Sequence, residues 1–370
     1  MSDSQAPGDP HAPGGADAPT AEHVVGHRAA VERAIIDAHA HVWNRARTPI
    51  DWIDESLPEI DRDFSVPELE TVAQDAATAL GARIDGFVLV QALNDAGETA
   101  DLLAAAHGPV VGWLDLDAPD APGRLDVLRG QPGGERLVGI RHLAHVDPDP
   151  EWLLRPTVAH GLDALAAAGL SFDLVVRPWQ LATAARVADA HPELQFVLDH
   201  LGQPPATAAP DAATSADPAT SAEPGDAAEA GPALTAIAGS AENGEAAFAR
   251  WAADLAELAR RPNVVAKVSG VAVRGGPASV ARLDRVAGVA LEAFGPGRLM
   301  FGSDWPLVRL ADDYRPWLAQ YLAWSSALSS HERQAIDADT ARSAYTPTRV
   351  PRALASAPGA AAASAEGTLR

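Results

Sequence analysis

Two histidines near the start of the chain have a spacing that could support chemistry. His39 and His41 lie in the mostly apolar run IIDAHAHVW over residues 35–43. On an extended strand, side chains two positions apart project to the same side. An HxH pair alone is weak evidence for a site. If both rings are buried, however, they need polar partners, because burial disfavours their charged form and leaves ring nitrogens to satisfy.

Two residues far along the chain could supply those partners. His200 lies in the run FVLDHLG, and Asp304 lies at the end of RLMFGSDW, so each is expected where a strand ends. Asp304 could hydrogen-bond the histidines or a water molecule between them. The structural alternatives are a helix N-cap for Asp304 and a satisfied core histidine for His200. We expect these two residues and the HxH pair to form one catalytic site.

The elements that must position these residues are eight short apolar runs that alternate with amphipathic segments. The runs cover residues 35–43, 86–92, 110–116, 138–144, 172–178, 196–202, 264–270 and 298–305. Helical periodicity between them is clearest at 157–169, 180–190 and 246–260 and weakest within 110–144. Apolar strands alternating with helices predict a parallel sheet. Eight units favour an α/β fold of the TIM type, a closed (β/α)8 barrel, over a doubly wound sheet, since no GxGxxG follows the first strand.

Other polar and aromatic side chains are expected at the same ends of the strands, where such barrels carry their active sites. The predicted substrate-binding residues are Gln91, Arg141, His142, Arg177, Lys267 and Trp43. Trp113, Trp179 and Trp305 are further candidates for a pocket wall, and rim packing is the alternative for each tryptophan. Either arginine could instead pair with Asp173 or Asp199.

Composition limits the partners and the compartment. The 50 acidic and 28 basic residues give a net charge of −22, which disfavours nucleic acids and anionic membranes as partners. The absence of cysteine excludes disulfides, thiolate metal sites and cysteine nucleophiles. No apolar run approaches a membrane span, and the first residues lack the pattern of a signal peptide. We therefore expect a cytoplasmic protein with a small-molecule substrate, and no oligomeric state follows from the sequence.

Three segments are expected to lie outside the packed domain. Residues 1–33, 206–246 and 351–370 are rich in alanine and other small or polar residues. Such segments bury too little apolar surface to offset the entropy of ordering them, so they are predicted to be disordered. The single domain then covers residues 34–350, with the acidic segment 206–246 inserted after the sixth strand.

The order of several motifs resembles a known family. The runs DAHAHVW, VLVQA, VGIRHL, FVLDHLGQP, VVAKVSG and RLMFGSDWP resemble the sugar-acid lactonase branch of the amidohydrolase superfamily. That branch includes L-fuconolactonase, L-rhamnonolactonase and 2-pyrone-4,6-dicarboxylate hydrolase. The resemblance covers residues 34–346 apart from the insertion, and it includes DTARSAY at 339–345. It implies the barrel fold and places His39, His41, His200 and Asp304 in the active site.

The resemblance also raises the question of a metal. Metal-dependent relatives add a histidine or a carbamylated lysine from the middle strands to the HxH pair and the last aspartate. The fifth strand carries Arg177 at that point, and a guanidinium has no lone pair to donate. The seventh strand carries Lys267 rather than a histidine. His200 matches the histidine that relatives use to handle water.

A single divalent ion such as zinc could still bind to His39, His41 and Asp304, with water as a fourth ligand. Arg141 and the two cationic side chains just named would raise the electrostatic cost of such an ion. We therefore predict that no metal cofactor is required.

The reaction implied is the hydrolysis of a lactone. Asp304 is expected to act as the general base on water, with a modestly raised pKa. His39, His41, His200 and Arg141 are expected to donate hydrogen bonds to the developing oxyanion. His200 could also protonate the alkoxide that leaves.

Two alternatives to a lactonase remain at this point. The first is a metal-dependent amidohydrolase or a decarboxylase of the same superfamily, and the missing histidine on the fifth strand disfavours it. The second is a non-catalytic barrel that binds partners through residues 206–246. The presence of the base and all three histidines disfavours the second.

Overall fold

The computed structural model describes residues 32–205, 244–272 and 280–346. The predicted disordered segments 1–33, 206–246 and 351–370 lie almost wholly outside these ranges, so their disorder stays a prediction. The first strand already begins at Arg33, one residue before the expected domain boundary, and a helix begins at Glu245, inside the segment 206–246 that was expected to be disordered. Within the described ranges, no helix combines the length and apolar character needed to cross a membrane.

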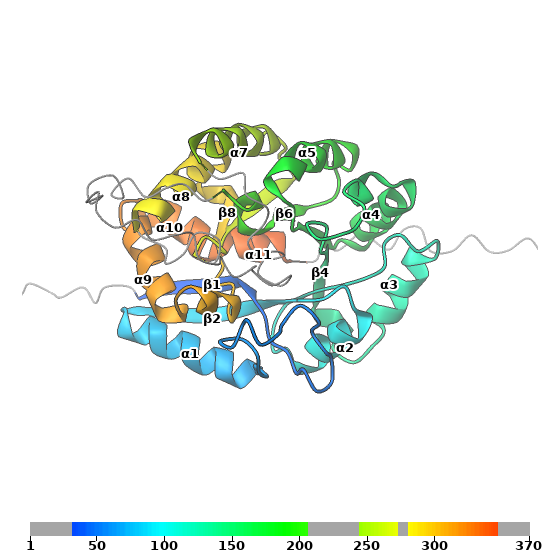
Figure 1. Cartoon of the computed structure of the whole chain (residues 1–370), viewed down its shortest axis with the longest axis horizontal. Helices are drawn as coiled ribbons and strands as arrows, with labels where there is room; N and C mark the ends of the chain where they lie inside the picture. Colours follow the sequence, from blue (N-terminus) through cyan, green and yellow to red (C-terminus); the bar gives the residue numbers. More distant parts are fainter. Residues whose placement is uncertain (1–31, 206–243, 273–279, 347–370) are drawn as a thin grey trace, which may run out of the picture. The chain divides into compact units, whose positions relative to one another are not determined.

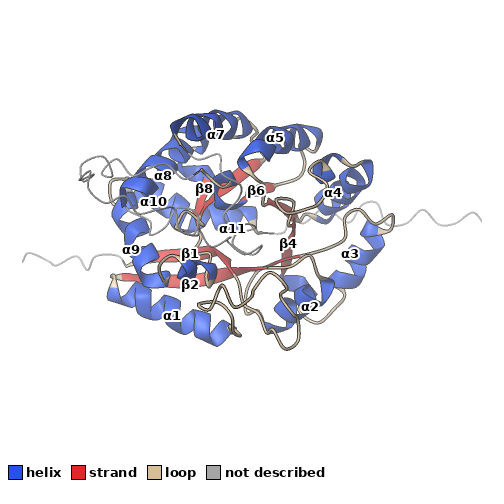
Figure 2. Ribbon diagram, viewed as in Figure 1, coloured by secondary structure: helices blue, strands red, loops and turns tan. Residues whose placement is uncertain are grey.

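Eight parallel strands form one sheet in which each strand pairs with the next along the chain. The strands are β1 (Arg33–Ala40), β2 (Ala82–Val90), β3 (Val110–Gly112), β4 (Leu137–His142), β5 (Ser171–Leu174), β6 (Phe196–Leu198), β7 (Val264–Val268) and β8 (Leu299–Phe301). Helices surround the strands (Figures 1 and 2). The predicted TIM-type barrel is confirmed.

Helices follow most strands and cover the outside of the barrel. They are α1 (Val66–Ala79), α2 (Ala96–Ala105), α3 (Ala121–Arg129), α4 (Pro156–Ala168), α5 (Leu181–Ala190), α7 (Glu245–Leu258), α8 (Val280–Phe294) and α9 (Tyr314–Ser325), followed by the short α10 (Ser330–Gln334) and α11 (Thr340–Ala344). Local signals explain several ends. Ser65 and Asp95 cap α1 and α2 by accepting backbone N–H groups, and Gly169 ends α4 in a left-handed conformation. α3 is the helix that the sequence marked poorly.

The interior of the barrel is filled by small and β-branched side chains. Val88, Val111, Val197 and Val265 belong to one buried cluster with residues of the last helix, α11, and with Tyr345. α11 lies across the middle of the view in Figure 1. Tyr345 reaches into the barrel, where its hydroxyl donates to a buried aspartate, Asp173, at 2.7 Å. The interior is therefore a packed core, and the site must lie above it.

The sheet closes between β8 and β1 through the segment that follows β8. The backbone N–H of Asp304 donates to the carbonyl of His39 at 2.8 Å, and that of His41 donates to the carbonyl of Trp305 at 2.7 Å. β8 itself ends at Phe301, so Asp304 lies in the loop beyond the strand. The same hydrogen bonds that close the barrel thus place Asp304 beside the HxH pair.

A buried carboxylate, Asp37, reinforces this closure. It accepts the backbone N–H groups of Ser303 at 2.8 Å and His39 at 3.2 Å, and the hydroxyl of Tyr314 at 3.0 Å. Burial raises the pKa of Asp37 to about 6, although the hydrogen bonds oppose this shift. The ionised form is therefore the costly one in the folded protein.

We expect the Asp37→Asn variant to gain stability relative to the parent protein as the pH rises. Folding raises the pKa of Asp37, so the protonated side chain stabilises the folded protein. This stabilisation is complete below pH 3.8, the pKa of Asp37 in the unfolded chain, and is lost as the pH rises through about 6. The loss is on the order of 3 kcal/mol, at about 1.4 kcal/mol for each pKa unit. An asparagine oxygen can still accept both N–H groups, and its NH2 can donate to Tyr314.

Urea unfolding of both proteins between pH 4 and pH 8 measures the difference. Glu98, whose pKa burial raises to about 7, titrates in both proteins and cancels in the comparison. A difference in unfolding free energy that stays constant across this range would contradict the expected role of Asp37.

Candidate active site

Four residues from three distant parts of the chain converge at the carboxyl ends of the strands. The Nε2 atoms of His39 and His41 are 3.1 Å apart. Asp304 Oδ1 lies 3.4 Å from His41 Nε2 and 3.7 Å from His39 Nε2, and Asp304 Oδ2 lies 4.0 Å from His200 Nδ1. All four residues are buried. The structure therefore brings together the residues that the sequence singled out, and their catalytic roles remain predictions.

The protonation of His41 follows from its backbone contact. His41 Nδ1 lies 2.7 Å from the carbonyl oxygen of Val90, which has no proton to give. Nδ1 must therefore be the donor. Burial lowers the pKa of His41, so the ring is neutral near pH 7 and Nε2 carries a lone pair. This arrangement argues against the expected role of His41 as an oxyanion donor, because Nε2 can only accept.

His39 lies deeper and has two competing partners. Its Nδ1 is 3.2 Å from Asp199 Oδ1 and 3.1 Å from Lys267 Nζ. Burial lowers the pKa of His39 well below its ordinary value; the negative charge of Asp199 opposes this shift, and the positive charge of Lys267 adds to it. The Nδ1 atom of the neutral ring can either donate to Asp199 or accept from Lys267. In the first case Nε2 carries a lone pair, and in the second case it carries the proton.

Asp304 is an ionised carboxylate directed at the histidines. Burial alone would raise the pKa of Asp304. His200, His41 and His39 have the larger, opposite effect, so the pKa lies below the usual range for aspartate. The modest rise expected from the sequence is therefore wrong. The side chain contacts the rings rather than capping the turn at Leu307–Leu310, and Oδ1 has no hydrogen-bond partner among the described residues.

His200 is held from the end of β7. Its Nδ1 lies 2.9 Å from the hydroxyl of Ser269, which is itself buried. Gly270 has a φ of +64°, and a Cβ at this position would lie 2.6 Å from the His200 ring. The Ser-Gly pair thus fits closely against the imidazole. Sequence reasoning missed both residues, although they stand in the run VVAKVSG, directly after the strand.

Arg141 and Gln91 bond to each other and retain unused polar atoms. Gln91 Nε2 donates to the carbonyl of Arg141 at 3.0 Å, and an Arg141 Nη donates to the carbonyl of Gln91. Arg141 also pairs with Asp199 at 2.9 Å, one of the structural pairings anticipated for it. Arg141 Nε and Gln91 Oε1 are buried with no partner in the described part of the chain. Arg141 Nε can therefore still donate a hydrogen bond to a ligand, and Gln91 Oε1 can still accept one.

Lys267 does not lie at the mouth of the barrel, where a substrate contact was expected. It is fully buried and pairs with Asp173 at 2.6 Å and Asp199 at 2.9 Å. Burial raises the pKa of Asp173. For Asp199, the positive charges of Lys267 and its neighbours outweigh burial and hold the pKa well below its ordinary value. The ammonium of Lys267 is therefore enclosed by protein groups.

The ring of His142 is fixed by its neighbours. It stacks on Trp152 with ring centres 3.7 Å apart, and its Nε2 lies 2.9 Å from Asp147. Trp113 donates its indole N–H to His142 Nδ1 at 3.3 Å. Both ring nitrogens of His142 therefore already have partners. A substrate could bind to this ring only by replacing Trp113 or Asp147.

The remaining tryptophans and the arginine that were predicted to contact a substrate differ in their exposure and contacts. Trp43 is 5% exposed, donates to the carbonyl of Arg62 and lines a small cavity beside Phe64, whereas Trp305 is fully buried. Trp179 is 62% exposed. Arg177 donates to the carbonyl of His145 at 3.2 Å and to Gln203 at 3.3 Å. A contact of Trp179 or Arg177 with a substrate stays a prediction.

The donor set fits a divalent metal ion. His41 Nε2 carries a lone pair, Asp304 Oδ1 is an unpartnered buried anion, and His39 Nε2 lies within 3.7 Å of both. Neutral imidazoles and a carboxylate are ordinary zinc ligands. Atoms of His39, His200 and Asp304 also lie within 4.8 Å of one another. The residues present could therefore hold such an ion.

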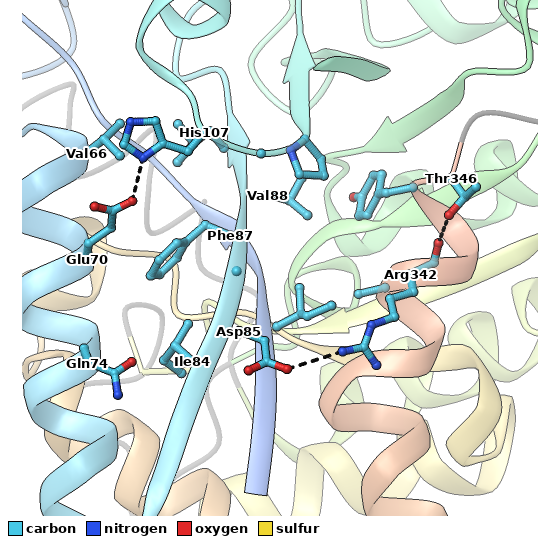
Figure 3. Close-up of a pocket in the computed structure, with 17 residues that line it drawn as sticks. Val66, Glu70, Gln74, Ile84, Asp85, Phe87, Val88, His107, Arg342 and Thr346 are labelled. Carbon is cyan, nitrogen blue, oxygen red and sulfur yellow. Dashed lines mark hydrogen bonds and ion pairs between the residues drawn. The ribbon is translucent and has the colours of Figure 1, made fainter. Parts of the chain in front are cut away.

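A separate cavity of about 630 Å³ lies beside β2, between α1 and the segment of α11. A hydrogen-bonded contact of His107 with Glu70 and an ion pair of Arg342 with Asp85 flank its apolar wall (Figure 3). None of the four converging residues lines this cavity. It is thus distinct from the candidate active site.

Comparison with known proteins gives consistent matches. A family model described as amidohydrolase matches residues 36–346. Two L-fucono-1,5-lactonases are similar to the chain. The one from Burkholderia ambifaria is 30% identical over 77% of this chain and 85% of its own length, and the one from Burkholderia multivorans is 33% identical over 84% and 95%. A crystal structure of a Burkholderia multivorans amidohydrolase with bound zinc has a TM-score of 0.67 and 30% identity, and covers 84% of this chain and 99% of that chain.

Proposed function

Because the chain belongs to the amidohydrolase family, we propose that it is a hydrolase that opens the lactone of a sugar acid, such as L-fucono-1,5-lactone. The two lactonases that are 30% and 33% identical to it support this substrate class. The observation that carries the proposal is the ionised Asp304, which has an unpartnered oxygen and three histidines around it. Such a group can take a proton from water.

The proposed reaction begins with a water molecule at Asp304 Oδ1. Asp304 takes one proton as the water oxygen bonds to the lactone carbonyl carbon. The second water hydrogen stays on the attacking oxygen. The carbonyl oxygen gains the negative charge, and the buried Arg141 Nε is available to donate to it.

The tetrahedral intermediate then collapses and breaks the bond to the ring oxygen. Asp304 first passes the proton that it took from water to His200, 4.0 Å away, by a small approach of the two groups, and the resulting imidazolium gives a proton to the leaving alkoxide. The products are an open hydroxy acid and the starting form of the enzyme. Ser269 fixes the His200 ring during both transfers.

We propose that this chemistry needs no metal. Arg141 Nη1 lies 3.4 Å from His39 Nε2, and the ammonium of Lys267 lies 3.1 Å from the other nitrogen of that ring. Two positive charges next to the donor set raise the electrostatic cost of a divalent cation. When bound at His39, His41 and Asp304, zinc would lower the pKa of a water ligand and polarise a carbonyl.

Chelated protein is therefore expected to keep its lactonase activity. The experiment removes metal with a chelator, verifies the removal by elemental analysis, and measures kcat/KM before and after. A protein carried through the same steps without chelator is the control. Loss of turnover that only zinc or manganese restores would show that the reaction requires the metal.

The substrate class is tested with a panel of aldonolactones in a pH-stat, since each turnover releases a proton near neutral pH. The panel includes both enantiomers of fuconolactone, and spontaneous opening provides the baseline. Aryl amides and hydroxybenzoic acids test the amidase and decarboxylase alternatives. A folded protein that accelerates none of these lactones would contradict the proposal.

A further inference from the structure

We infer that Lys267 and Asp199 compete for one nitrogen of His39, and that Lys267 holds the ring in the tautomer that does not bind metal. The inference deepens the proposed function, because it explains how this site could work without a cofactor. Its test does not depend on turnover, so it can fail while the lactonase proposal stands, or the reverse.

The competition takes place at His39 Nδ1, which is completely buried. Lys267 Nζ lies 3.1 Å from it and Asp199 Oδ1 lies 3.2 Å from it. The lysine can only donate a hydrogen bond and the carboxylate can only accept one. A neutral imidazole carries one proton, so Nδ1 can satisfy one of these partners but not both.

The choice at Nδ1 decides the state of Nε2 on the far side of the ring. If Lys267 donates to Nδ1, the proton of His39 is on Nε2 and points toward His41 Nε2, 3.1 Å away. That atom is an acceptor, because His41 Nδ1 donates to the carbonyl of Val90. The chain from Lys267 through both rings to Val90 is then complete without a metal ion.

The other tautomer leaves a defect that a metal ion would fill. If His39 Nδ1 donates to Asp199, the Nε2 lone pairs of His39 and His41 face each other at 3.1 Å. Asp304 Oδ1, also without a proton, lies beside them. Three electron-pair donors with no hydrogen between them repel one another, and the long contact of Arg141 Nη1 with His39 Nε2, at 3.4 Å, relieves only part of this repulsion. A cation between them would remove it. Only this tautomer is a ligand for metal.

The hydrogen-bond requirements of Lys267 favour the first tautomer. Its ammonium has three N–H groups, and two acceptors lie at hydrogen-bonding geometry, Asp173 Oδ2 at 2.6 Å and His39 Nδ1 at 3.1 Å. Asp199 Oδ1 lies 2.9 Å away as an ion-pair partner without a hydrogen bond. A buried N–H without an acceptor would cost about 1–3 kcal/mol. Asp199 is less dependent on His39, because Lys267 and Arg141 both contact it.

The choice of lysine at this position is unusual for the chain. Lys267 is the only lysine, and the other 27 basic residues are arginines. A planar guanidinium forms a fork, whereas an ammonium directs its protons to the corners of a tetrahedron. Two carboxylates and an imidazole nitrogen around one point need the second geometry. The single lysine therefore matches the task that we assign to it.

The first test reads the tautomer by NMR on metal-free protein with ¹⁵N-labelled histidine. The signals of His39 are identified among the twelve histidines by their loss in a His39→Gln variant. We expect Nδ1 of His39 to be unprotonated and Nε2 to be protonated in the parent protein. Protonated Nδ1 in the parent protein would overturn the inference by itself.

The second test removes the lysine without leaving an unpaired charge. In the double variant Asp173→Asn, Lys267→Met, one cation and one anion are lost together and Asp199 remains. We expect the proton of His39 to move to Nδ1. The affinity for zinc, measured against a chromogenic chelator, should rise by about 10–100-fold, the range by which residues that hydrogen-bond a metal ligand change metal affinity.

Tyr345→Phe is the matched control. It removes another hydrogen bond to Asp173, at 2.7 Å, but does not change the charge or touch His39. In this variant, the tautomer of His39 and the affinity for zinc are expected to equal those of the parent protein. An unchanged zinc affinity in the double variant, or an equal rise in Tyr345→Phe, would overturn the role of Lys267. Should the double variant not fold, the tautomer of the parent protein decides the question.

Discussion

Asp304→Asn is expected to lower kcat/KM for lactone hydrolysis about a thousandfold, within the range for loss of a general base. An asparagine has nearly the same shape, and the backbone N–H of residue 304 still donates to His39. The amide, however, cannot take a proton from water. The loss should therefore fall on kcat rather than on KM, as measured by initial rates over a range of lactone concentrations.

Asp312→Asn provides the control for this variant. Asp312 follows the same loop and accepts a hydrogen bond from Gln320 at its side chain, but it lies outside the converging residues. Its activity is expected to stay within about twofold of the parent, as for surface changes away from special features. If Asp304→Asn hydrolysed lactone at a near-normal rate while folded, Asp304 would not be the base.

The same assignment fixes the acid side of the pH profile. Because the neighbouring histidines hold the pKa of Asp304 below the usual range for aspartate, the base stays ionised throughout the weakly acid range. Loss of kcat/KM through protonation of Asp304 is therefore expected only below about pH 3.9, the ordinary aspartate pKa. A titration of activity near pH 6 in folded protein would point to a different base.

The second large effect is on stability. Lys267→Met alone is expected to lower the free energy of unfolding by about 3–5 kcal/mol, as found when one partner of a buried ion pair is removed. The change leaves Asp173 and Asp199 buried without the cation that lies 2.6 and 2.9 Å from them. Urea unfolding at neutral pH measures the loss.

The double variant Asp173→Asn, Lys267→Met is expected to recover most of that stability. The remaining carboxylate, Asp199, still pairs with Arg141 at 2.9 Å. If the single and double variants unfolded at the same urea concentration, the cost would come from lost packing of the lysine stem rather than from unpaired charge.

The fold and the convergence of the four residues could be predicted because each depends on local patterns. Each of the eight runs indicated its own strand, and closure of the sheet then brings His39 and Asp304 together whatever the distance between them in sequence. The proton states could not be predicted in this way. The donor role of His41 Nδ1 depends on the carbonyl of Val90, and backbone carbonyls leave no mark in a sequence.

The place of Lys267 shows a second limit. It was correctly assigned to the seventh strand, but which layer of the barrel a side chain occupies depends on where the strand begins and how neighbouring strands are staggered. The structure puts Lys267 opposite Met300 of β8, in the packed interior, with Ser269 two residues further along the chain. The lowered pKa of Asp304 was missed for a related reason, because it depends on three histidines that are far from it or from one another in the sequence.

The junction between β1 and β8 has a consequence for the newly made protein. The HxH pair is synthesised near the beginning of the chain, whereas the carboxylate that joins it is about 265 residues further on. A nascent polypeptide on the ribosome therefore holds the imidazoles long before it holds the base. Hydrolytic activity should appear abruptly, only when the final strand has emerged and docked, so that every active molecule has completed its barrel.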